Sequence, residues 1–137
     1  MPPKNKLSVR ALAIKNGYKS GLEDNIAKQL SSLGHPVDYE TMKISWEDSM
    51  TRSYRPDFLL SNGVIIESKG RFLAGDRRKH LEIQKQHPEL DIRFVFSNSG
   101  ARYSKKTTKV KKTYADWCNA NGFKWADKLV PEDWINE

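Results

Sequence analysis

The sequence predicts a single α/β domain built on a mixed β-sheet. A chain of 137 residues suits one domain with a modest core. Phe58–Leu60 and Val64–Ser68 flank Asn62-Gly63, and Asn-Gly supplies the positive φ angles of a tight hairpin turn. The hairpin is antiparallel, whereas a predicted helix joins its second strand to the next β-forming run, which favours a parallel neighbour. Together these features indicate a mixed sheet flanked by helices.

The chain is predicted to begin with a flexible basic arm, residues 1–19, followed by one folded domain, residues 20–137. Ser20 and Glu23 have the spacing of a capping box, so we expect a helix to begin there and to end at Gly34. One face of this helix is expected to be buried, because aliphatic residues recur at helical spacing: Leu22, Ile26, Leu30 and Leu33.

The elements on either side of the hairpin follow from similar patterns. Residues 37–46 alternate loosely and predict a strand, and the polar residues 47–53 predict a turn or a bridge. After the hairpin, Asp76 is expected to be the N-cap of a helix over residues 76–86. The remaining predicted elements are a buried strand at 92–96, a basic loop at 101–112, a helix between Thr113 and Gly122, a strand at 123–125 and a helical turn at 131–135.

The net charge of +7 is unevenly distributed. Residues 1–20 carry +5 and residues 101–112 carry +6, each without an acidic residue, which leaves −4 for the rest of the chain. Such segments favour a polyanion partner, although solvated surface charge produces the same pattern. The residues that would contact the polyanion are Lys4, Lys6, Arg10, Lys15, Lys19, Arg102, Lys105, Lys106, Lys109, Lys111 and Lys112.

Several classes of protein are excluded. No apolar run approaches the ~20 residues of a membrane span, and residues 1–6 lack the apolar core of a signal peptide. The single cysteine, Cys118, rules out a disulfide framework and a Cys-based zinc site, so we expect a reducing, cytoplasmic setting. Cys118 lacks a paired histidine and is interpreted as a buried thiol. The histidines do not have metal-ligand spacing: His35, His80 and His87.

The most informative pattern is Asp57 followed by Glu67-Ser68-Lys69. Residues two apart in a strand share a face, so Glu67 and Lys69 are expected to project together, and the hairpin brings Asp57 alongside them. Carboxylates bind Mg²⁺, which activates water for phosphodiester hydrolysis, and a nearby lysine stabilises the transition state. The backbone carbonyl of Ser68 is a further candidate ligand. The same pattern also arises from an ordinary surface ion pair.

Glu23 has two interpretations. As the third residue of a capping box it is explained by helix capping alone, and this is the reading that the local pattern favours. As a metal ligand it would supply a third carboxylate for a second ion. Asp24, beside it, is a weaker candidate for the same role.

A set of motifs from about residue 20 to the end resembles the bacteriophage endonuclease I family, the Holliday-junction resolvases of T-odd-type podophages. They occur in the family's order and with nearly its spacing. These motifs are Ser20–Asp24, Pro56–Leu60, Asn62-Gly63, Glu67–Gly70, Arg78–Leu81, Gln86–Arg93, Val95–Ser97, Ala126–Leu129 and Trp134-Ile135.

The resemblance implies a PD-(D/E)xK nuclease fold and an intertwined, domain-swapped homodimer, with residues 43–54 as the bridge between subunits. It implies cleavage of branched DNA, especially four-way junctions, by paired nicks that need Mg²⁺ or Mn²⁺, with two ions in each active site. Asp57, Glu67 and Lys69 match catalytic positions, and Glu23 matches the family's additional active-site glutamate, which replaces the capping preference. Asp57, Glu67, Glu23 and the Ser68 carbonyl would hold the metals.

The resemblance also implies a phage protein that acts in the cytoplasm of the infected host cell, with DNA as the polyanion. Two alternatives remain at this point. One is another PD-(D/E)xK nuclease, of the mismatch or restriction type, and the other is a non-catalytic basic DNA-binding module.

Overall fold

The computed structural model describes residues 21–47, 51–105, 107 and 109–137. It is a mixed α/β structure whose main sheet has five strands in the order β1-β4-β5-β6-β7, and a second, two-stranded sheet pairs β2 with β3. The elements are α2 (Gly21–Ser32), β1 (Val37–Tyr39), β2 (Ile44–Glu47), β3 (Thr51–Tyr54), β4 (Phe58–Leu60), β5 (Ile65–Lys69), α3 (Ala74–Gln86), β6 (Ile92–Phe96), α4 (Tyr114–Asn121), β7 (Trp125–Asp127) and α5 (Glu132–Ile135).

The sheet is mixed in the way that the sequence predicts. Strand β4 pairs antiparallel with β1 and β5, whereas β5, β6 and β7 run parallel to one another. The hairpin between β4 and β5 turns at Gly63, whose φ of 89° is favourable for glycine alone among the common residues. The carboxyl ends of the three parallel strands therefore lie at one edge of the sheet.

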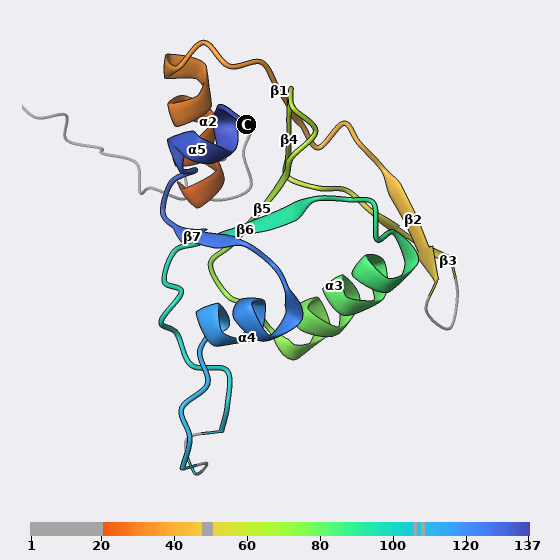
Figure 1. The fold of residues 1–137 in the computed structure, drawn as a ribbon, viewed down its shortest axis with the longest axis vertical. Coiled ribbons are helices and arrows are strands. Elements are labelled where there is room, and N and C mark those ends of the chain that lie inside the picture. The colour runs from red at the N-terminus through yellow and green to blue at the C-terminus, as the bar shows by residue number, and fades with distance from the viewer. Residues whose placement is uncertain (1–20, 48–50, 106, 108) are drawn as a thin grey trace, which may run out of the picture.

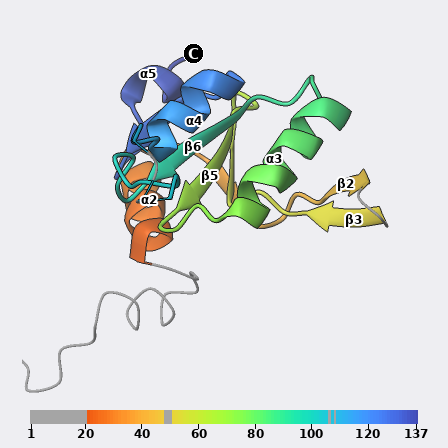
Figure 2. The ribbon, with the colours of Figure 1, turned by 90° about the horizontal axis from the view of Figure 1, so that it is seen from below.

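Helices cover both faces of the main sheet, so the domain has three layers (Figure 1). Helices α2 and α5 lie on one face and α3 and α4 on the other. The small β2–β3 sheet extends from the main sheet alongside α3 (Figure 2). Within the described ranges, no helix combines the length and the apolar composition of a membrane span.

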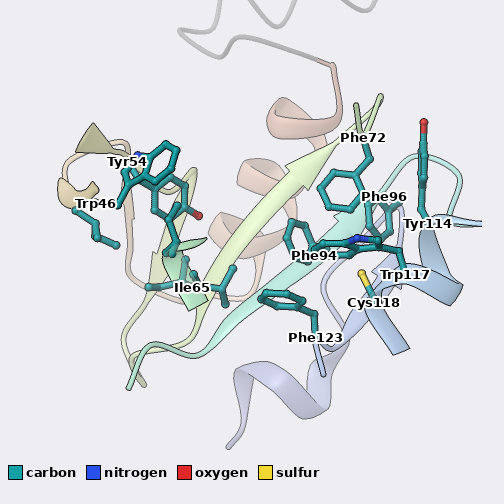
Figure 3. Packing of buried hydrophobic residues seen from close by; sticks show 13 residues of the cluster. Trp46, Tyr54, Ile65, Phe72, Phe94, Phe96, Tyr114, Trp117, Cys118 and Phe123 are labelled. Carbon is teal, nitrogen blue, oxygen red and sulfur yellow. The ribbon is translucent and has the colours of Figure 1, made fainter. Parts of the chain in front are cut away.

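Alternation along the parallel strands creates two separate cores. Ile66 and Val95 point toward α2, whereas Ile65, Phe94 and Phe96 belong to the aromatic cluster under α3 and α4. Figure 3 shows this cluster: Trp46 and Tyr54 of the β2–β3 sheet lie at one end, and residues of α4 lie at the other. The predicted burial of strand 92–96 is confirmed, since all five of its residues are buried.

Some predicted boundaries are wrong. Residues 37–46 form two strands instead of one, because β1 pairs with β4 in the main sheet while β2 pairs with β3. The break follows Glu40, which has a φ of 52°. Asp76 is not the N-cap of its helix: α3 begins at Ala74, and the Asp76 carboxylate accepts a hydrogen bond from the Leu73 N–H at 3.1 Å.

Other predictions are confirmed or lie outside the described residues. The helix predicted between Thr113 and Gly122 is confirmed as α4, which Thr113 and Asp116 cap at its start and Gly122, in the left-handed conformation, caps at its end. The last strand, β7, starts two residues later than predicted. Cys118 is buried, as expected. The predicted arm, residues 1–19, and the proposed cap Ser20 lie outside the described part of the chain.

Candidate active site

The centre of the site is Asp57, immediately before β4. The β4–β5 register places it opposite the carboxyl end of β5, and its Oδ2 accepts hydrogen bonds from the Ser68 N–H at 2.9 Å and the Ser68 hydroxyl at 2.8 Å. The Asp57 backbone carbonyl accepts a hydrogen bond from the Glu40 N–H at 3.1 Å. Asp57 is therefore tied to both neighbouring strands, which fixes its carboxylate in a buried position.

Glu67 and Lys69 project together from β5, as predicted. Lys69 Nζ lies 3.4 Å from Glu67 Oε1 and 3.6 Å from Asp76 Oδ1 at the start of α3. The other oxygen of Glu67, Oε2, accepts a hydrogen bond of 2.7 Å from the buried hydroxyl of Tyr54. The lysine is thus held between two carboxylates, and each oxygen of Glu67 has its own partner.

A second group of carboxylates meets Asp57 from the other side. One oxygen each of Glu23, Glu40 and Asp57 lies within 4.8 Å of the other two. Glu23 is buried on the first turn of α2 and accepts a hydrogen bond from the Tyr39 hydroxyl. The neighbouring Asp24 pairs instead with Lys28 of its own helix at 3.0 Å. Glu23 and Asp57 thus meet within one chain here, whereas the resemblance implies that Glu23 of one subunit joins Asp57, Glu67 and Lys69 of the other.

Burial and crowding of negative charge disturb the protonation equilibria of the site. Burial raises the pKa of Glu67 to about 7, and the charge of Asp57 adds to this, while Lys69 and the Tyr54 hydroxyl oppose it. Burial also raises the pKa of Asp57, against the hydrogen bonds from Ser68. Burial lowers the pKa of Lys69, but Glu67 and Asp76 outweigh that effect and the net change is upward.

The donor set fits a hard divalent cation. Carboxylate oxygens are the preferred protein ligands of Mg²⁺, and three of them converge here, one each from Glu23, Glu40 and Asp57, with Glu67 adjacent. Burial and neighbouring negative charges raise the pKa values of Asp57 and Glu67. A cation bound among these carboxylates would offset both effects and stabilise the ionised forms.

Three residues of this site were not predicted from the sequence. Glu40 lies within the strand predicted for residues 37–46 and carries no pattern of its own, and it joins the cluster because the chain turns at its positive φ. Tyr39 was predicted only as a strand residue, and Tyr54 only as part of the bridge at 43–54. The folded arrangement shows that each donates a hydrogen bond to a glutamate of the site. Ser68 was predicted as a metal ligand through its backbone carbonyl. In the structure its hydroxyl and N–H donate hydrogen bonds to Asp57.

The predicted polyanion contacts divide into described and undescribed residues. The 101–112 segment is a projecting loop closed by a bridge between Arg102 and Thr113, and the Arg102 guanidinium donates to Ser104 within the loop (Figure 1). The exposed cations of this loop are Lys105, Lys109, Lys111 and Lys112. Outside the described residues lie Lys4, Lys6, Arg10, Lys15, Lys19 and Lys106.

A mixed sheet that gathers buried carboxylates and one lysine at a single edge has the chemistry of a metal-dependent nuclease. Sequence comparison agrees with this class. The family model for phage endonuclease I matches residues 5–137, and the chain belongs to this family.

Two relatives carry corresponding names. The chain is 46% identical to Endonuclease I of Escherichia phage T7 over 121 residues, which cover 88% of this chain and 79% of that protein. It is also 46% identical to Endodeoxyribonuclease 1 of Enterobacteria phage T3, again over 121 residues, covering 88% of this chain and 78% of that protein.

Proposed function

We propose that the protein is a structure-selective DNA endonuclease that resolves four-way junctions and other branched DNA by paired nicks. The observation that carries this proposal is the meeting of Asp57 with two groups, Glu23 with Glu40 and Glu67 with Lys69, in a chain that belongs to the phage endonuclease I family. The relatives' names support action on DNA. We place this activity in the cytoplasm of the infected host cell.

Asp57 is the ligand that two divalent ions, Mg²⁺ or Mn²⁺, would share in this proposal. One ion would be held by Asp57, Glu67 and the Ser68 carbonyl, and the other by Asp57, Glu23 and Glu40. When bound, the ions supply an activated water nucleophile and neutralise charge on the phosphate. The hydrogen bonds from Ser68 hold the Asp57 carboxylate in place for this role.

Lys69 is the cationic group of the site. Its ammonium lies between Glu67 and Asp76 and its pKa is raised, so it stays protonated at neutral pH. From this position it orients the attacking water by hydrogen bonding and stabilises the negative charge that develops on the phosphate oxygens. Asp76 restrains the lysine from the α3 side, since it lies 3.6 Å away.

DNA binding is proposed to involve the basic segments and the projecting loop. Four exposed lysines of that loop offer a cationic surface for phosphates. Arg77 of α3 lies over the ring of Tyr103 at 4.5 Å, which attaches the base of the loop to the helix that also carries Asp76. Phosphates held by the loop would therefore lie on the same side of the domain as Lys69.

We further propose a homodimer that shares its active sites by exchange of the N-terminal part. Glu23 and Glu40 precede the β2–β3 hairpin in the chain, whereas Asp57, Glu67 and Lys69 follow it. If the hairpin, residues 43–54, opens into a bridge, α2 and β1 of one chain make the same contacts with the partner chain. A two-fold dimer then offers two equivalent sites to two opposed strands of a junction.

Junction cleavage tests the proposed activity. The wild-type protein should nick a four-way junction in Mg²⁺ and leave a linear duplex of the same sequence intact at equal concentration. Lys69→Ala should abolish cleavage while junction binding in EDTA survives. Lys124→Ala, at an exposed lysine remote from the acidic cluster, is the matched control and should cleave normally.

The alternatives give different results in the same assay. Equal cleavage of linear duplex would indicate a mismatch or restriction-type nuclease. Junction binding without cleavage in any divalent metal would indicate a DNA-binding module, and cleavage by Lys69→Ala would contradict the proposed role of the lysine.

The exchange is tested by mixing two inactive variants. Glu23→Ala and Asp57→Ala chains, refolded together, form a heterodimer that regains one intact site if the subunits share their sites. Nicking of one strand only is then expected. A dimer that is wholly inactive argues against exchange.

A further inference from the structure

Tyr54 is a buried residue of the site whose hydroxyl has no sequence-level explanation. It ends β3 and is 1% exposed. Its side chain lies beside Trp46 at the end of the aromatic cluster nearest the β2–β3 sheet, remote from Tyr114 at the α4 end (Figure 3). From there its hydroxyl reaches Glu67 Oε2 at 2.7 Å.

The two oxygens of Glu67 therefore have different surroundings. Oε2 accepts the hydrogen bond from Tyr54, and Oε1 lies 3.4 Å from Lys69 Nζ. A carboxylate on a flexible glutamate side chain rotates freely unless its partners fix it. Here the buried donor on one oxygen determines which oxygen faces Lys69.

The tyrosine ring is itself held in place from two directions. Lys79 Nζ lies 4.9 Å from the ring centroid, a cation–π contact. The ring of His80 packs edge-on against it, with centroids 5.2 Å apart and an interplanar angle of 88°. The hydroxyl is therefore a pre-oriented donor, which is the property that a support for a metal ligand requires.

We propose that Tyr54 is a positioning residue of the nuclease site, which holds Oε2 of Glu67 and so presents Oε1 to the divalent ion beside Asp57 and Lys69. This inference rests on the proposed function. Residues that orient a metal ligand usually change metal affinity or activity 10–100-fold when they are removed, roughly the range we expect here. Tyr54 does not touch substrate in this scheme and acts only through Glu67.

Removal of the hydroxyl alone tests the inference. Tyr54→Phe keeps the ring and its contacts with Lys79 and His80, and Tyr114→Phe is the matched control in the same aromatic cluster. Mn²⁺ binding is measured by calorimetry without DNA, and single-turnover junction cleavage is measured as a function of Mg²⁺ concentration. Junction affinity in EDTA and the melting temperature are recorded for all variants.

We expect Tyr54→Phe to bind Mn²⁺ about tenfold or more weakly and to need correspondingly more Mg²⁺ for half-maximal cleavage, with junction affinity unchanged. Tyr114→Phe should match the wild type. Tyr54→4-aminophenylalanine retains a donor at the same place and should restore metal affinity. A hydroxyl that only supports packing would lower the melting temperature without moving the metal affinity.

Two results overturn the inference in distinguishable ways. If the wild type binds Mn²⁺ and cleaves junctions, but Tyr54→Phe has wild-type Mn²⁺ affinity, Tyr54 does not position Glu67 and the proposed function stands. If the wild type itself neither binds divalent metal nor cleaves junctions, the proposed function fails and the inference fails with it.

Discussion

Replacement of Glu67 by glutamine should stabilise the metal-free protein, and the gain should depend on pH. Glu67 is a buried residue of β5, and burial raises its pKa from 4.5 to about 7. The native state therefore binds a proton more tightly than the unfolded chain between these two pH values. By linkage, this group makes the native state less stable as the pH rises from about 4.5 through 7.

The size of the effect follows from the same two values. At about 1.4 kcal/mol for each pH unit, the difference corresponds to about 3 kcal/mol of destabilisation at pH 8. Glutamine resembles the protonated carboxyl, and its oxygen can still accept from Tyr54. Glu67→Gln should therefore unfold with a free energy about 3 kcal/mol higher than the wild type at pH 8, and about equal to it at pH 4.5.

Guanidinium unfolding in EDTA at pH 4.5, 6, 7 and 8 measures this difference, and thermal melting at pH 8 should show a shift of about 10 °C. Glu132→Gln, at an exposed glutamate of α5, is the control and should show no such pH dependence. The same Glu67→Gln variant should not cleave DNA. A gain that is equal at all pH values, or a loss of stability at pH 8, would refute the assignment of the buried charge to Glu67.

Three further outcomes are expected. Arg93→Met should lower the free energy of unfolding by about 1–2 kcal/mol in chemical denaturation, because the buried Arg93 forms ion pairs with both Asp91 and Glu137. The loss stays small because these two carboxylates are half-exposed and water can solvate them in the variant. Lys109→Ala, at an exposed lysine of the projecting loop, should weaken junction binding and make the slope of log affinity against log salt less negative by about 1, and an unchanged slope would exclude a phosphate contact there. Cys118, whose pKa burial raises to about 12, should resist a thiol reagent at pH 8 until guanidinium unfolds the domain.

Local patterns in the sequence predicted the framework of the site well. The Asn62-Gly63 turn and the period of two along β5 were sufficient to place Glu67 and Lys69 on one face, with Asp57 returning beside them. These features depend on neighbours in the chain, and their physical determinants, turn φ angles and strand alternation, are visible in residue types.

The remaining parts of the site depend on contacts between distant segments. Glu40 reaches Glu23 and Asp57 only because β1 pairs with β4 and the chain turns sharply after Tyr39. The split of residues 37–46 into two strands also depends on pairing with distant segments, because local strand preferences do not determine which sheet each half joins. A glutamate at position 23 is expected both for helix capping and for metal binding, so the residue type alone does not separate the two roles. Only the family resemblance favoured metal binding.

Asp57 connects three strands as well as the two groups of side chains that form the site. Its carbonyl accepts from Glu40 after β1, and its carboxylate accepts from Ser68 on β5. An ion bound at this point would act as a reversible cross-link between segments that are distant in the chain, so the ion concentration and the thermal resistance of the domain would be thermodynamically linked. Loss of the ion would then lower nuclease activity and the stability of this end of the sheet together. A domain whose strand ends have locally unfolded would therefore not cleave DNA.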